Sequence, residues 1–79
     1  MRVKIDHDAA EFPFEQLASI IRERIASGQY AAGQKLPTIN DIVADTGLAP
    51  TTIRRAFAVL ANEGLVKIVP GRGTYVAQR

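Results

Sequence analysis

The chain has 79 residues, which suits a single small domain over residues 1–79 with one hydrophobic core. Its 47% apolar and 23% charged residues are typical of a globular domain and exclude a disordered or fibrous chain. The absence of cysteine excludes disulfides, thiol nucleophiles and thiolate zinc sites. No apolar run approaches the roughly 18 residues of a membrane span, and the first residues lack the pattern of a signal peptide, so we expect a cytoplasmic protein.

The charges are distributed unevenly along the chain. Residues 1–45 carry seven acidic and five basic side chains, whereas residues 46–79 carry one acidic and five basic side chains. We therefore expect one basic face that attracts a polyanion and another face of neutral or acidic character.

The first predicted element is a helix over residues 13–27. Pro13 suits a first helical position, and Gly28 is a typical C-terminal stop. Apolar residues recur between them at the spacing of one helical face. A turn-rich connector over residues 29–37 follows, with a short extended piece at residues 35–36. The apolar face of the helix consists of Phe14, Leu17, Ala18, Ile21 and Ile25.

Two shorter helices are predicted next, over residues 39–46 and 50–63. Thr38 and Asp41 have the spacing of a capping box at the start of the first of them. Pro50 suits the first position of the second. Two short helices joined by a tight turn that contains glycine are typical of a helix-turn-helix motif. The apolar face over residues 50–63 consists of Ile53, Ala56, Phe57 and Leu60.

A β-hairpin is predicted after Gly64, where the apolar period changes. Strand-forming residues fill the segments 65–69 and 74–78, and a Pro-Gly-Arg-Gly turn over residues 70–73 separates them. Three helices followed by a hairpin predict a mainly α fold with a small β part, the winged helix-turn-helix.

The third predicted helix has a polar face opposite its apolar one. At about 100° per residue, Thr51 and Arg55 fall on the side away from Ile53, and Arg54 lies on the flank. An α-helix fits the major groove of DNA, where arginine pairs with guanine and threonine contacts a thymine methyl group or a phosphate. The N–H groups at the helix start also favour a phosphate near Thr51 and Thr52, although these two threonines can instead cap the helix.

Arg72 stands between two glycines at the tip of the predicted hairpin. Glycine permits a tight turn and a close approach of the backbone, and an exposed arginine can enter a minor groove or pair with a phosphate. A Gly-Arg-Gly tripeptide also occurs in ordinary tight turns. Its position directly after a helix-turn-helix favours a hairpin that touches DNA.

Several blocks of sequence, taken together and in order, resemble the GntR family of bacterial transcriptional regulators, in its YtrA-like or HutC-like branch. The resemblance covers essentially the whole chain. It implies a sequence-specific regulator of transcription, a repressor, that binds double-stranded DNA at an inverted-repeat operator as a homodimer. In a bacterium this protein would lie in the cytoplasm, on the nucleoid when bound. The blocks are residues 25–30, 36–38, 51–57, 63–66 and 71–76.

The resemblance also implies which residues contact DNA. The third helix lies in the major groove and the hairpin, or wing, lies in or near the minor groove. The family pattern points to Arg54, whereas helical spacing points to Arg55, and both stay candidates. The other expected contact residues are Thr38 and Asn40, then Ala49, Pro50, Thr51 and Thr52, then Gly71, Arg72, Gly73 and Thr74.

Three positions depart from the family pattern. Ile39 replaces an acid, Asn40 replaces a frequent arginine, and Ala49-Pro50 replaces a frequent Ser-Arg or Thr-Arg. The loss of a capping hydroxyl at Ala49 costs on the order of 1 kcal/mol. The operator sequence therefore does not carry over from better-known members.

Length is a further departure, because family members normally continue into a C-terminal domain that binds an effector and holds the dimer together. The 79 residues form either a stand-alone DNA-binding protein or part of a longer one. We expect no small-molecule effector site, cofactor or metal within them. The segment Asp6-His7-Asp8 has no fourth ligand nearby, and we interpret it as solvated surface.

The main alternative is a winged-helix module for protein–protein interaction, which would expose apolar residues on the outer face of the third helix. Thr51, Arg55 and Asn62 occupy that face instead. An enzyme lacks support, because no paired carboxylates, nucleophile–base pair or phosphate loop is present. RNA binding would favour exposed aromatic side chains, whereas the three phenylalanines are expected at or near core positions.

Overall fold

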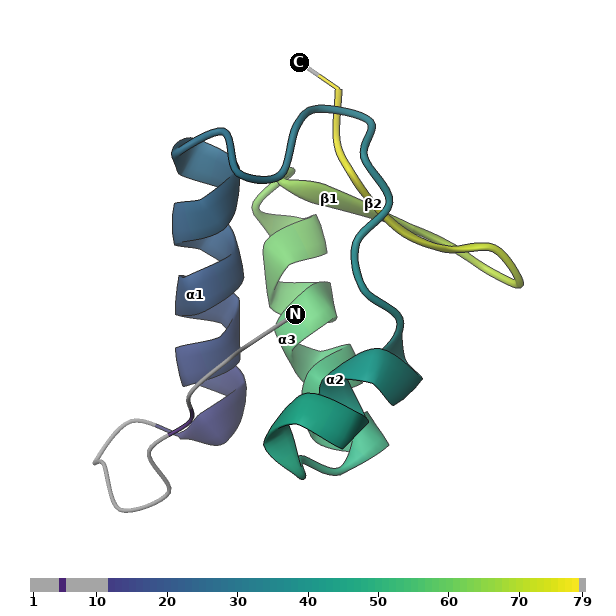
Figure 1. The fold of residues 1–79 in the computed structure, drawn as a ribbon. Helices are drawn as coiled ribbons and strands as arrows, with labels where there is room; N and C mark the ends of the chain where they lie inside the picture. The colour runs from purple at the N-terminus through teal and green to yellow at the C-terminus, as the bar shows by residue number, and fades with distance from the viewer. Residues whose placement is uncertain (1–4, 6–11, 79) are drawn as a thin grey trace.

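The computed structural model describes residue 5 and residues 12–78. Three helices are followed by a two-stranded antiparallel sheet whose hairpin projects to one side of the helices (Figure 1). This is the predicted winged helix-turn-helix. The segment Asp6-His7-Asp8, interpreted from sequence as solvated surface, lies outside the described residues. The elements are α1 (Pro13–Ala26), α2 (Ile39–Thr46), α3 (Pro50–Asn62), β1 (Val66–Val69) and β2 (Gly73–Val76).

The observed elements differ from the predicted ones mainly at their C-terminal ends. Helix α3 stops at Asn62, and Gly64, at φ 77°, lets the chain reverse there. The backbone N–H of Gly64 donates to the carbonyl of Ala61, and the N–H of Leu65 donates to the carbonyl of Leu60. This is a Schellman motif. Because the N–H of Leu65 is used in this motif, β1 begins at Val66, one residue later than expected.

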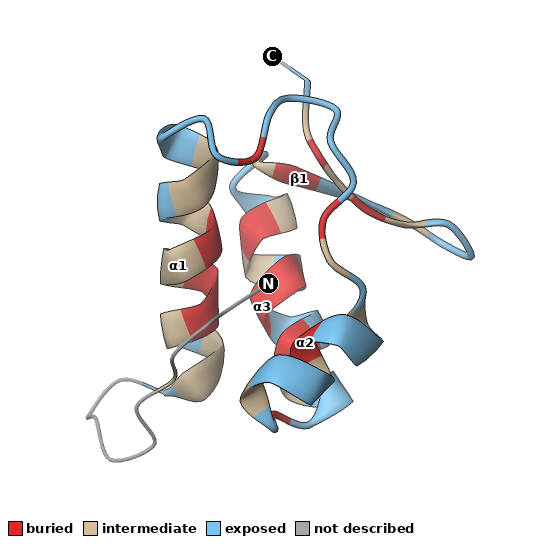
Figure 2. Cartoon of the chain, viewed as in Figure 1, coloured by how far each residue is buried: buried red, intermediate tan, exposed pale blue. Residues whose placement is uncertain are grey.

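The core lies between α1 and α3, with α2 covering one end and the base of the hairpin the other. Figure 2 shows the buried positions as stripes on the facing sides of α1 and α3. The helical spacing predicted these stripes. At the two ends of α1, however, Phe14 and Ile25 belong to the predicted apolar face but are only half-buried. Phe12 was expected near the core, but its side chain is 65% exposed, because it lies outside the first turn of α1. The largest fully buried side chains are Leu17, Ile21, Ile42, Ile53 and Leu60.

The connector between α1 and α2 pairs with the free edge of β2. The N–H of Val76 donates to the carbonyl of Gln34 at 2.9 Å, and the N–H of Leu36 donates to the carbonyl of Thr74 at 2.8 Å. Lys35 and Tyr75 form an antiparallel bridge between them. The short extended piece expected at residues 35–36 thus acts as a third strand that fixes the base of the hairpin to the helical body.

An ion pair joins α1 to the residue that caps α3. Arg22 donates from Nε and Nη2 to the two carboxylate oxygens of Glu63, at 2.7 and 2.6 Å. Hydrogen bonding to the guanidinium lowers the pKa of the Glu63 carboxyl below its ordinary value of 4.5. The two-point geometry holds the C-terminal end of α3 against α1.

We expect this ion pair to give part of the stability a defined pH dependence. Because the folded pKa of Glu63 lies below 4.5, the contribution is complete above that pH and is lost as the pH falls through the folded value. Urea unfolding of the wild type and of Glu63→Gln over a series of pH values would measure it. The variant should be less stable at neutral pH and should converge with the wild type in acid. Parallel curves would contradict the prediction.

Candidate nucleic-acid interface

A groove of about 600 Å³ lies between the start of α2, the start of α3 and the hairpin. It brings together residues from three separate segments of the sequence, 37–40, 50–57 and 68–74. None of the side chains that line it is acidic. Eight of the twelve residues expected to contact DNA line this groove: Thr38, Asn40, Pro50, Arg54, Gly71, Arg72, Gly73 and Thr74.

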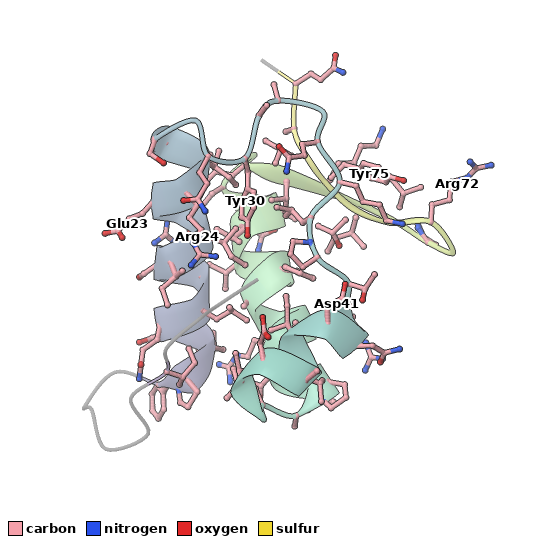
Figure 3. The ribbon with its side chains drawn as sticks, in the orientation of Figure 1. Glu23, Arg24, Tyr30, Asp41, Arg72 and Tyr75 are labelled. Carbon is pink, nitrogen blue, oxygen red and sulfur yellow. The ribbon has the colours of Figure 1, made fainter. Side chains whose placement is uncertain are left out.

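The start of α2 is held by the predicted capping box. Thr38 Oγ1 accepts a hydrogen bond from the backbone N–H of Asp41, and the N–H of Thr38 donates to Asp41 Oδ2, both at 3.1 Å. Both hydrogen bonds lower the pKa of the Asp41 carboxyl and so favour its charged form. The bond from the Thr38 backbone N–H has the larger effect. Figure 3 shows Asp41 at the first turn of α2. The reciprocal cap fixes the helix start that presents Asn40 to the groove.

The start of α3 has no such cap. Ala49 occupies the N-cap position and offers no side-chain hydrogen bond, and Pro50 follows at the first helical position. Thr51 is exposed and Thr52 is half-buried. Neither side chain caps the helix, so the capping interpretation of these two threonines receives no support. The positive end of the helix dipole is left without a side-chain acceptor beside the groove.

The two consecutive arginines of α3 lie on different sides of the helix. Arg54 lines the groove. Arg55 instead places its guanidinium carbon 4.0 Å from the centre of the Phe14 ring on α1, in a cation–π contact. Phe12 stacks on Phe14 in turn, with the ring centres 6.2 Å apart. Arg55 is exposed, as helical spacing predicted, but its guanidinium lies against the Phe14 ring of α1, whereas Arg54 lines the groove.

The tip of the hairpin is a tight turn that presents Arg72. The N–H of Arg72 donates to the carbonyl of Val69 at 3.0 Å, with Pro70 and Gly71 between them. Proline at the second position and a glycine with φ 75° at the third are features of a type II turn. The Arg72 side chain extends away from the sheet at the far end of the wing (Figure 3).

The remaining predicted contact residues have different surroundings. Thr74 is only 7% exposed and its carbonyl accepts from Leu36, so it supports the hairpin from within the groove. Ala49 and Thr51 are exposed beside the groove at the start of α3.

One exposed apolar side chain of the groove, Ile68, was not singled out from the sequence. Ile68 on β1 is 46% exposed, although β-branched residues of a short strand usually pack inward. Alternation along β1 places Ile68 on the same face as buried Val66. This alternation is the only feature of the sequence that could have pointed to Ile68. The other apolar residues of the groove are Pro37, Ile39, Pro50, Phe57, Val69 and Pro70.

The part of the chain that the structure describes offers neither a metal site nor a membrane span. Residue 5 and residues 12–78 contain no group of three or more side chains suited to hold a metal ion. Within the same residues, no helix has both the length and the apolar character needed to cross a membrane.

A family model and several known proteins match this chain. The model described as "Bacterial regulatory proteins, gntR family" matches residues 13–76. The mannosyl-D-glycerate transport/metabolism system repressor MngR of Escherichia coli is 34% identical over 65 residues, which are 82% of this chain and 27% of MngR. The chain spans less than a third of the length of several such curated relatives.

Two solved structures share the fold. YtrA from Sulfolobus acidocaldarius, a GntR-family transcription factor, is 30% identical with a TM-score of 0.89 and matches 100% of this chain and 83% of its own. The DNA-binding domain of AraR, in complex with operator ORX1, is 29% identical with a TM-score of 0.86, over 98% of this chain and 99% of its own.

The contact between Arg55 and Phe14 should have a measurable effect on stability. We expect Arg55→Ala to lower the free energy of unfolding by about 0.5–1 kcal/mol, the usual value of an exposed cation–π contact. Phe14→Leu keeps an apolar side chain but removes the aromatic face. Urea unfolding of the wild type, both single variants and the double variant would give the coupling free energy. Additive effects would show that the two side chains do not interact.

Proposed function

The chain belongs to the gntR family of bacterial regulatory proteins, and from this membership and its groove we propose that it represses transcription by binding a specific duplex operator. We place α3 in the major groove and the wing in or near the minor groove. In this proposal the protein acts in the bacterial cytoplasm, on the nucleoid when bound. No catalytic role is proposed.

One observation carries the proposal: the lining of the groove brings together residues of the start of α2, of α3 and of the wing tip, and it includes no acidic side chain. A duplex offers bases in two grooves and phosphates between them, and each of these segments suits one of those targets. The similar AraR domain forms a complex with its operator, which supports DNA binding by this domain.

Each segment has a role in the proposed complex. Arg54 has the length and the planar donor set to pair with guanine or a phosphate in the major groove. Asn40 can read an adenine at an adjacent base pair. The uncapped N–H groups near Thr51 suit a phosphate. Arg72 enters or borders the minor groove.

We further propose that two copies bind an inverted repeat. One such domain buries a small interface, and two copies on a twofold-symmetric site double the contacts and the specificity. The half-sites should then lie about 10 base pairs, or a multiple of this, apart from centre to centre.

The alternative of a protein-interaction surface on α3 has little support. The large apolar side chains that are exposed among the described residues are Phe12 and Ile68, and neither belongs to α3. The outward positions of α3 instead carry polar, charged or small residues, such as Thr51, Ala58 and Asn62.

Selection of duplexes from a random library should test the function directly. We expect enrichment of a palindromic consensus whose half-sites are separated by about one helical turn. A non-palindromic consensus would contradict binding as a symmetric pair, and the absence of any enrichment would contradict sequence-specific binding.

Comparison of the two arginines should test the assignment of the groove. We expect Arg54→Ala to weaken binding to the selected duplex by about 10- to 100-fold, because one well-formed base contact contributes about 1–3 kcal/mol. Arg55→Ala is the matched control, since it removes an identical charge from the neighbouring position that contacts α1. Fluorescence anisotropy at fixed salt would measure both affinities. An equal loss in both variants would contradict the assignment.

A further inference from the structure

The groove has an apolar floor beneath its cationic rim. Strand alternation puts Val66 and Ile68 on the inner face of the hairpin. The helices bury Val66 but do not cover Ile68, which is 46% exposed. Phe57 of α3 lines the same groove and is buried. The rim carries Arg54 on one side and Arg72 on the other. The groove therefore offers both apolar and cationic side chains, which suit an occupant that carries apolar and anionic groups.

We propose that one sugar–phosphate strand of the duplex runs through this groove, with its deoxyribose carbons packed on Ile68 and its phosphates beside Arg72. This inference rests on the proposed function. If α3 occupies the major groove and the wing occupies the minor groove, the strand that separates those two grooves must pass between α3 and the hairpin. Such a strand alternates apolar sugars with anionic phosphates, which matches the floor and the rim.

The position of Ile68 favours sugar over base as its partner. A thymine methyl group, the usual apolar feature of a base edge, lies in the major groove. Ile68 belongs to the hairpin, on the side of the groove nearest the minor groove in the proposed complex. Contact with sugar does not depend on the base sequence, so Ile68 adds affinity for any duplex, whereas Arg54 and Asn40 discriminate among sequences.

The affinity of Ile68→Ala for the selected duplex tests this inference. We expect a loss of about tenfold, or about 1.4 kcal/mol, with no change in the slope of log affinity against log salt, because no charge is removed. Arg72→Ala should instead reduce the slope by about one. Ile68→Val removes one methylene-sized group and should give a smaller loss. Phe12→Ala is the matched control, an exposed apolar residue outside the groove, and should bind like the wild type.

Three outcomes would overturn the inference in different ways. Ile68→Ala that binds as tightly as the wild type would show that no strand packs on this side chain, while the proposed function would stand. A loss that disappears when every thymine of the duplex is replaced by uracil would assign Ile68 to a thymine methyl group instead. If the wild-type protein binds no duplex at all, the proposed function itself is contradicted. Thermal unfolding of each variant would confirm that its fold is intact.

Discussion

The pairing of residues 34–36 with β2 is the constraint on which the candidate interface depends. A hairpin of two four-residue strands has little stability of its own, and it needs packing or a further strand to hold a fixed direction. The hydrogen bonds from Leu36 to Thr74 and from Val76 to Gln34 supply that strand. Because residues 34–36 lead directly into Pro37 and the cap of α2, the same segment sets the positions of the wing and of α2. The width of the groove therefore follows from a few backbone hydrogen bonds.

The arginines of the described residues are divided between contacts within the fold and the lining of the groove. Arg22 is committed to Glu63 and Arg55 to the ring of Phe14, and both contacts hold helices together. Arg54 and Arg72 line the groove, whose lining has no carboxylate. The excess of basic residues in the second half of the sequence therefore does not measure the strength of the interface, because part of that charge stabilises the fold. Of the two consecutive arginines of α3, Arg55 lies close enough to α1 to contact Phe14, whereas Arg54 lines the groove.

The sequence predicted the fold well and the interface only in part. Helical spacing identified Leu17, Ile21, Ile53 and Leu60 as core residues, because burial of one helix face depends on a local period. It could not show that Arg55 contacts Phe14 while Arg54 lines the groove, since this depends on where α1 packs, a contact between residues about forty positions apart. Ile68 was missed for a similar reason. Alternation gives the face of a strand, but not the point at which the helices cease to cover it.

The start of α3 has a consequence for the energetics of the whole domain. With Ala49 as its N-cap, the helix lacks the internal acceptor that α2 receives from Thr38, and part of its first turn is left to solvent. An anion bound there would take the place of the missing cap. Ligand occupancy and helix stability are then thermodynamically linked, so that the domain gains stability whenever the site is filled. With alanine at position 49, the start of α3 lacks the stabilisation that a capping side chain would give, and an anion bound there would couple the order of α3 to its own binding.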